Sequence, residues 1–128
     1  RYVKKGGTIC VVSHSLSPNI LRDYRENDLP EPKLVYGWEV PRERRKPQPY
    51  ALYDSMEKLR FPADEPLVLD DHKPGCDMAR AAGVRFAAAL WSNGIPEIEA
   101  FMRKNCGLCF KTVAQFGDYL FSGKEETT

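Results

Sequence analysis

The stretch Leu67-Val68-Leu69-Asp70-Asp71 decides the fold that this sequence predicts. Its three apolar residues form a short uninterrupted run, as expected for a strand that is buried on both faces of a parallel sheet. A loop with Lys73-Pro74-Gly75 follows and leads to the small-residue helix Asp77–Ala82, which Gly83 closes. The order of strand, loop and helix is typical of one β–α unit of an α/β domain.

The same pattern recurs on both sides of this stretch. The other predicted strands are Thr8–Val12, Leu34–Tyr36, Arg85–Leu90 and Leu108–Phe110. The predicted helices run from Ser17 to about Asn27, from Pro49 to Leu59, from Pro96 onward, and from Thr112 to near Phe121, where a polar tail, 122–128, begins. This alternation predicts an α/β fold with a mainly parallel sheet, whose ligands bind at the carboxyl ends of the strands.

Composition excludes several classes of protein. The 128 residues carry a formal net charge of +1, and 42% are hydrophobic, which fits one soluble domain with a substantial core. The near-neutral charge gives no reason to expect nucleic acid or an anionic membrane as a partner. No apolar run reaches the roughly 20 residues of a membrane span, and no signal peptide opens the sequence. We therefore expect a cytoplasmic protein.

The carboxylates of Asp70 and Asp71 end a strand that should be buried. Adjacent carboxylates repel each other, and each resists desolvation. A divalent cation removes both costs, and oxygen-only ligands suit Mg²⁺. The pair therefore predicts a magnesium site, with Asp77 as a third candidate, although Asp77 would serve equally as an acid in the first helical turn. The ordinary alternative is a polar turn.

Two further side chains occupy places where an anion can bind. Ser13 directly follows the first strand and can donate its hydroxyl near the start of the next helix, or it is an ordinary turn serine. Lys46 precedes a helix within a basic, proline-rich run. It can hold a phosphoryl group, or it belongs to a solvated charged surface.

In their order along the chain, these motifs resemble the haloacid dehalogenase-like (HAD) hydrolase superfamily. The similar segments are Val11-Val12-Ser13 for its second motif, Lys46-Pro47 for its third, and Leu67–Asp71 with Ala79–Gly83 for its fourth, the most specific one. The phosphoglycolate-phosphatase-like and β-phosphoglucomutase-like branches are the most similar. The resemblance implies a Rossmann-like three-layer core, of which residues 1–121 would be a part.

The resemblance also implies a site and a reaction. Ser13, His14 and Lys46 would bind the substrate, and Asp71, with Asp70 beside it, would hold Mg²⁺. Ser13, Lys46 and Asp71 would act in catalysis. The reaction would be hydrolysis of a small phosphorylated metabolite, assisted by the bound magnesium ion.

Three features depart from the pattern of this superfamily. Many relatives have an acid at the position of Gly75 and an asparagine at that of His14. The nucleophile of the superfamily lies in an Asp-x-Asp motif after its first strand, and no Asp-x-Asp occurs in this sequence. The 32 residues between Ser13 and Lys46 also leave no room for an inserted cap domain.

A missing upstream segment would account for the absent nucleophile. The sequence begins with Arg1, and Lys4-Lys5-Gly6-Gly7 is typical of the end of a helix. In the superfamily, the strand before the nucleophile lies between the strands that correspond to Thr8–Val12 and Pro66–Leu69. We therefore expect an upstream segment that completes the sheet, and we expect the 128 residues alone to be inactive.

Other functions stay open. The first alternative is a non-catalytic HAD-like module that uses the sheet for binding. A receiver-like or nucleotide-binding domain is disfavoured, because the order of acids and lysine is reversed and glycine-rich phosphate loops are absent. Whether Trp91-Ser92-Asn93-Gly94, after the strand that follows the Asp pair, lines the site is a further open question.

Charge and cysteines add two smaller observations. Residues 1–60 have a net charge of +4 and residues 61–128 a net charge of −3, so the half with Lys46 would attract an anion. Cys106 and Cys109 have C-x-x-C spacing, which suits zinc or redox chemistry. Because no further zinc ligands lie nearby in the sequence, we expect two part-buried thiols beside a short strand.

Overall fold

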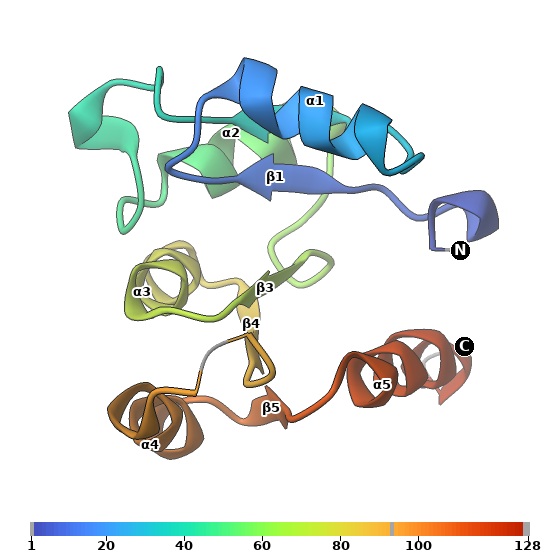
Figure 1. Cartoon of the computed structure of the whole chain (residues 1–128), viewed down its shortest axis with the longest axis vertical. Helices are drawn as coiled ribbons and strands as arrows, with labels where there is room; N and C mark the ends of the chain where they lie inside the picture. The colour runs from blue at the N-terminus through green and yellow to red at the C-terminus, as the bar shows by residue number, and fades with distance from the viewer. Residues whose placement is uncertain (1, 93, 127–128) are drawn as a thin grey trace. The chain divides into compact units, whose positions relative to one another are not determined.

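The structure is a computed structural model that describes residues 2–92 and 94–126 of the chain (Figure 1). It divides into an N-terminal unit, Arg1–Pro62, and a C-terminal unit, Ala63–Thr128. Both units contain parallel strands joined by helices, which confirms the predicted α/β class and the parallel pairing. The described strands form two sheets, one in each unit.

The N-terminal unit contains the smaller sheet. Strands β1 (Cys10–Val12) and β2 (Leu34–Tyr36) pair in parallel, with Val11 opposite Val35. Helix α1 (Ser17–Glu26) connects them, because parallel neighbours need a crossover connection. The remaining elements are the 3-10 turns η1 (Val3–Lys5) and η2 (Arg42–Arg44) and helix α2 (Tyr50–Leu59).

Two side-chain contacts fix the positions of these elements. The Glu39 carboxylate accepts hydrogen bonds from the Ser17 N–H (2.9 Å) and hydroxyl (2.6 Å) at the start of α1. These bonds lower the pKa of Glu39. The Tyr36 hydroxyl donates to Asp54 Oδ2 (2.6 Å) and so joins β2 to α2. Both contacts hold the loop between β2 and α2, which carries Lys46.

The C-terminal unit contains a three-stranded parallel sheet in the order β3-β4-β5. Its strands are β3 (Leu67–Asp70), β4 (Arg85–Ala89) and β5 (Leu108–Phe110). Its helices are α3 (Lys73–Ala82), α4 (Pro96–Asn105) and α5 (Val113–Glu126). Asp70 lies opposite Ala88, so the carboxyl end of β3 is level with the buried end of β4.

Small side chains let α3 pack closely on this sheet. Ala79 of α3 and Ala87 and Ala88 of β4 have no exposed surface, and α3 contacts both β3 and β4. On the α4 side, Met102 is fully buried against Ala88 and Leu90. The small-residue pattern of the sequence thus reflects close helix–sheet packing.

The largest differences from the predicted elements are at α3, at α5 and near the N-terminus. Helix α3 begins at Lys73, so the predicted loop Lys73-Pro74-Gly75 is its first turn, where proline is favoured because no N–H is needed there. Helix α5 continues past Phe121 to Glu126. The predicted helix end at Lys4–Gly7 is the 3-10 turn η1, which Gly6 ends with a left-handed φ of 92°.

Strands β1 and β3 each have one hydrogen-bonded neighbour among the described residues. β1 pairs with β2, and β3 pairs with β4. In both strands, therefore, one edge carries no strand from the described part of this chain.

Candidate functional site

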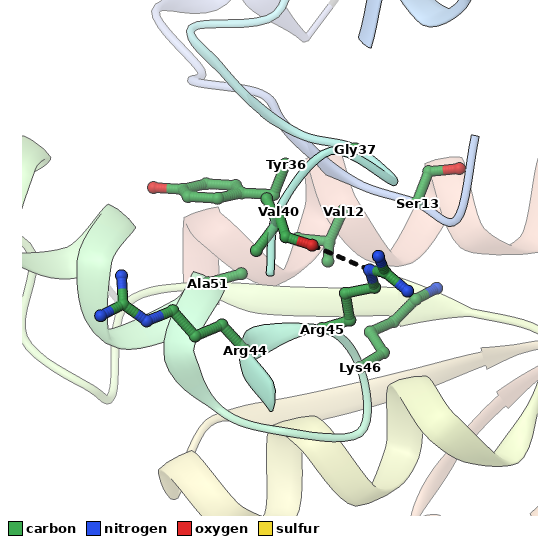
Figure 2. A pocket seen from close by; sticks show the side chains of 9 residues that line it. All are labelled: Val12, Ser13, Tyr36, Gly37, Val40, Arg44, Arg45, Lys46 and Ala51. Carbon is green, nitrogen blue, oxygen red and sulfur yellow. Dashed lines mark hydrogen bonds between the residues drawn. The ribbon is translucent and has the colours of Figure 1, made fainter. Parts of the chain in front are cut away.

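Ser13 directly follows β1, as predicted, and its backbone is held in place by β2. The Ser13 N–H donates to the Tyr36 carbonyl (2.9 Å), and the Ser15 N–H donates to Ser13 Oγ (3.0 Å). Ser13 and Lys46 line one cavity of about 10 Å³, enough for a single water (Figure 2). The structure thus brings together two of the predicted residues.

Arg45 is a neighbour of Lys46 that sequence analysis did not select. Its Nε donates to the Val40 carbonyl (2.8 Å), and its guanidinium lies 3.6 Å from the centre of the Trp38 ring. Figure 2 shows Arg45 and Lys46 extending to the same side of the cavity as Ser13. A carbonyl and a ring therefore hold a second cation beside the predicted one.

Arg44 and His14 point elsewhere. The Arg44 guanidinium lies over the Tyr50 ring (4.8 Å), and Figure 2 shows this side chain extending away from Lys46. The His14 ring meets Trp38 edge to face, with ring centres 5.7 Å apart. His14, a predicted substrate ligand, is thus placed at the end of β1 beside the ring that also carries Arg45.

The predicted carboxylate pair lies at the carboxyl end of β3. Asp70 Oδ1 accepts a hydrogen bond from the Asp71 N–H (2.8 Å). Asp71 Oδ1 lies 2.8 Å from His72 Nδ1, and Asp71 Oδ2 accepts a bond from the Ser92 hydroxyl (2.8 Å). One ligand atom from each of Asp70, Asp71 and His72 lies within 4.8 Å of the others.

These contacts set the charge state of Asp71. Partial burial alone would raise its pKa, but the hydrogen bonds from Ser92 and His72 outweigh burial and lower the pKa to about 2. Asp71 is therefore fully ionised at neutral pH. An ionised carboxylate beside a second carboxylate is the arrangement that a bound cation stabilises.

The cluster fits a divalent cation with oxygen ligands. Each carboxylate oxygen has two lone pairs, so an oxygen that accepts one hydrogen bond can still coordinate a metal. A Cβ on Gly75 would lie 2.6 Å from Asp70 Cγ, so a larger residue here would require Asp70 or the first turn of α3 to shift. Asp77, the third candidate, forms an ion pair with Lys73 (2.9 Å) and is not part of the cluster.

Sequence analysis did not identify His72, a member of the cluster, and it left open whether Ser92 lines the site. Within the segment left open above, Ser92 follows β4 and its hydroxyl donates a hydrogen bond to Asp71. Asn93 lies outside the described residues. Ser92 could have been selected because it follows β4, the strand that pairs with β3. His72 could have been selected because it directly follows the acid pair.

The predicted site residues form two groups, one in each unit. Ser13 and Lys46 share a cavity in the N-terminal unit, together with Arg45. Asp70 and Asp71 share a cluster in the C-terminal unit. The first group is cationic and suits an anion, and the second is anionic and suits a cation.

No protein-family model and no curated protein matches the sequence. Solved structures do match. One named as a haloacid dehalogenase-like hydrolase from Bacteroides fragilis has a TM-score of 0.74 at 24% identity, over 89% of this chain and 53% of its own. One named as a β-phosphoglucomutase from Thermotoga maritima has a TM-score of 0.68 at 14% identity. The match covers 98% of this chain and 56% of the chain of that structure.

A third match has the name of a phosphoglycolate phosphatase from Lactobacillus delbrueckii subsp. bulgaricus. Its TM-score is 0.70 at 22% identity, over 91% of this chain and 47% of its own. The chain thus spans about half the length of these structures. Among the described residues, no helix is long and apolar enough to cross a membrane. The chain has the fold of the core of haloacid dehalogenase-like hydrolases, as the sequence motifs predict.

Proposed function

We propose that this chain is the phosphate-binding and magnesium-binding part of a cytoplasmic, HAD-like phosphatase that acts on a small phosphorylated metabolite. The observation that carries the proposal is the acid pair Asp70 and Asp71 after β3, where Ser92 and His72 keep Asp71 ionised. The hydrolase names of the structures that share this fold support the same function.

Each group of residues would have a separate task. Asp70 and Asp71 would hold Mg²⁺ through carboxylate oxygens, and Mg²⁺ would supply positive charge to the phosphoryl group during attack. Ser13 would donate its hydroxyl hydrogen to a phosphoryl oxygen. Lys46 would offset the charge of that group, and His14 would contact the substrate beside Ser13.

The substrate would lie at the mouth of the cavity between Ser13 and Lys46. That cavity, about 10 Å³, is too small for a phosphoryl group. Arg45, fixed by Val40 and Trp38, would add a second cation at the same place. Because Arg45 is already held in place, its binding to an anion would not carry the entropic cost of ordering that long side chain.

The nucleophile is the part that this sequence does not contain. No Asp-x-Asp occurs in it, so turnover would need an aspartate from a segment outside the printed residues. The same absence favours a second candidate function, a non-catalytic HAD-like module that binds Mg²⁺ and a phosphorylated ligand. The two candidates share both binding sites and differ in the presence of the nucleophile.

Calorimetric titration of the 128-residue chain with Mg²⁺, followed by inorganic phosphate, tests the shared part of the proposal. We expect Asp71→Asn to weaken Mg²⁺ binding by roughly 100-fold, because it removes a ligand charge. Asp77→Asn, a matched change on the surface of α3, should leave Mg²⁺ binding unchanged. Equal Mg²⁺ affinity of Asp71→Asn and wild type would overturn the magnesium site.

Adding the nucleophile separates the two candidates. A segment with a strand that ends in Asp-x-Asp would be supplied to the chain, and phosphate release would be measured with Mg²⁺. The phosphatase predicts hydrolysis that is lost when the first aspartate of that segment is replaced by asparagine. Binding of phosphate without any hydrolysis would favour the non-catalytic module.

A further inference from the structure

Three sulfur atoms from two helices lie together in the C-terminal unit. Cys76 Sγ of α3 lies 3.7 Å from Cys106 Sγ, which directly follows α4. Met102 Sδ, one helical turn before Cys106, lies 3.7 Å from the same Cys106 sulfur. Cys106 is thus the central member of a sulfur cluster, Cys76–Cys106–Met102, that the sequence spacing did not indicate.

The partner of Cys106 is Cys76 and not Cys109. The Cys109 thiol donates to the carbonyls of Met102 (3.6 Å) and Cys106 (3.5 Å). It is therefore hydrogen-bonded to the backbone at the end of α4. The C-x-x-C spacing therefore does not form the dithiol pair. Neither thiol of the actual pair is part of a disulfide in the structure.

The distance between the two thiol sulfurs would allow both of them to bind one metal ion. With metal–sulfur bonds of about 2.3 Å, two sulfurs 3.7 Å apart subtend an angle of roughly 110° at a shared ion. That angle lies in the range of tetrahedral and trigonal coordination. A disulfide instead requires the sulfurs to approach to about 2.05 Å. The pair is therefore closer to a metal-binding geometry than to a disulfide.

The sulfur cluster is shielded on one side and accessible on the other. Cys76 is 3% exposed and Met102 is fully buried. Cys76 and Cys106 line a cavity of about 220 Å³, which gives a small ion a route to the sulfurs. Arg80 lies on the wall of that cavity, and its guanidinium donates to the Asn105 carbonyl (3.3 Å).

We propose that Cys76, Cys106 and Met102 form a binding site for a soft monovalent cation, Cu(I). Two thiolates and one thioether are soft ligands, which select Cu(I) over hard cations such as Mg²⁺. Zinc fits less well, since a structural zinc site takes four ligands and this cluster offers two thiolates. The site is separate from the carboxylate cluster and does not depend on the proposed phosphatase function.

The balance of protons and charge is consistent with this site. Cu(I) would displace one proton from each of Cys76 and Cys106, and no atom would be oxidised or reduced. The two thiolates and the ion together would have a net charge of −1. The Arg80 guanidinium on the cavity wall offsets that charge.

The test is a titration of the fully reduced 128-residue chain with Cu(I) under argon, against the chromogenic chelator bicinchoninate. We expect one tight Cu(I) per chain, and an X-ray absorption spectrum with only sulfur neighbours. Cys106→Ser should weaken binding by roughly 100-fold, and Met102→Leu, which keeps the buried volume, by about tenfold. Cys109→Ser, a matched half-buried thiol, should bind as wild type does.

Circular dichroism of each variant separates loss of ligands from loss of fold, and Met102→Leu keeps the test valid if a cysteine variant unfolds. Equal loss of Cu(I) affinity in Cys109→Ser and Cys106→Ser would overturn the proposal, because any thiol would then suffice. Cu(I) affinity no higher than that of free glutathione would also overturn it. So would a Cys76–Cys106 disulfide that forms while the reduced chain binds no Cu(I).

Discussion

At the scale of single residues, Asp71 makes the stability of this chain depend on pH. Its pKa is about 2 in the folded chain, below the ordinary value of 3.8, because Ser92 and His72 hydrogen-bond to the ionised form. The folded state therefore binds the Asp71 proton more weakly than the unfolded state does. Its contribution to stability is complete above the ordinary value and is lost as pH falls through the folded value.

Urea unfolding of wild type and Asp71→Asn over this pH range measures the contribution. We expect the wild type to be more stable near neutral pH, and the difference to shrink between pH 3.8 and about 2. Asparagine has no such titration, so the variant should lack this part of the pH dependence. A stability difference that stays constant as pH falls would contradict the assignment.

Arg45 gives a second prediction at this scale. Replacing it by glutamine removes the cation that Trp38 and Val40 hold beside Lys46, and should weaken binding of inorganic phosphate roughly fivefold, or about 1 kcal/mol. Arg44→Gln removes the same charge from a side chain that lies over Tyr50 and points away. Calorimetry with phosphate compares the two, and equal losses would mean that net charge alone is responsible.

Sequence analysis could identify the candidate site residues that directly follow a strand. Ser13, Asp70 and Asp71 follow predicted strands, so the rule for parallel sheets selects them directly. Ser92 and Arg45 depend on tertiary contacts. Ser92 is 21 residues from Asp71, and the Arg45 stack on Trp38 has no periodic signature.

At the scale of elements, Gly75 connects helix α3 to the acid pair. A Cβ at this position would lie 2.6 Å from Asp70 Cγ, and the first turn of α3 would have to move. We expect Gly75→Ala to destabilise the chain by about 1–3 kcal/mol, as overpacking does, and to weaken Mg²⁺ binding.

Gly117→Ala in α5 is the matched control for this change. No heavy atom lies within 4 Å of a Cβ there, and alanine favours helix by up to about 1 kcal/mol. Denaturant unfolding should therefore show a loss of stability for Gly75→Ala and no loss for Gly117→Ala. Wild-type Mg²⁺ affinity in Gly75→Ala would show that Asp70 tolerates the displacement.

The sequence predicted the types of the elements more accurately than the residues at which they begin and end. Apolar runs predicted all five strands, and Gly83 correctly ended α3 with a left-handed φ of 71°. The start of α3 was placed too late, because Lys73-Pro74-Gly75 contains two residues typical of turns and also suits a first helical turn. The cap of α1 by Glu39 arises 22 residues away and cannot be read from local sequence.

At the scale of the whole molecule, the half of the sequence that contains the cationic site residues has a positive net charge, and the half that contains the acid pair has a negative one. Residues 1–60, with Ser13 and Lys46, have a net charge of +4, and residues 61–128, with the acid pair, have −3. An anionic substrate and a metal cation would each be attracted to the group that is proposed to bind it. The α/β class and the parallel pairing followed from the order of strands and helices, whereas division into two sheets depends on which strand neighbours are present.

The absence of an Asp-x-Asp motif from the sequence leads to the last prediction. Magnesium, Lys46 and Ser13 would stabilise charge on a phosphoryl group, but none of them is a nucleophile that can form the phosphoryl-enzyme bond. We therefore expect the 128 residues with Mg²⁺ to hydrolyse p-nitrophenyl phosphate no faster than Mg²⁺ in buffer. Hydrolysis above that background would show instead that a group of this chain acts as the nucleophile. Because Asp70 lies beside the proposed metal, Asp70→Asn would then be the first variant to test for that role.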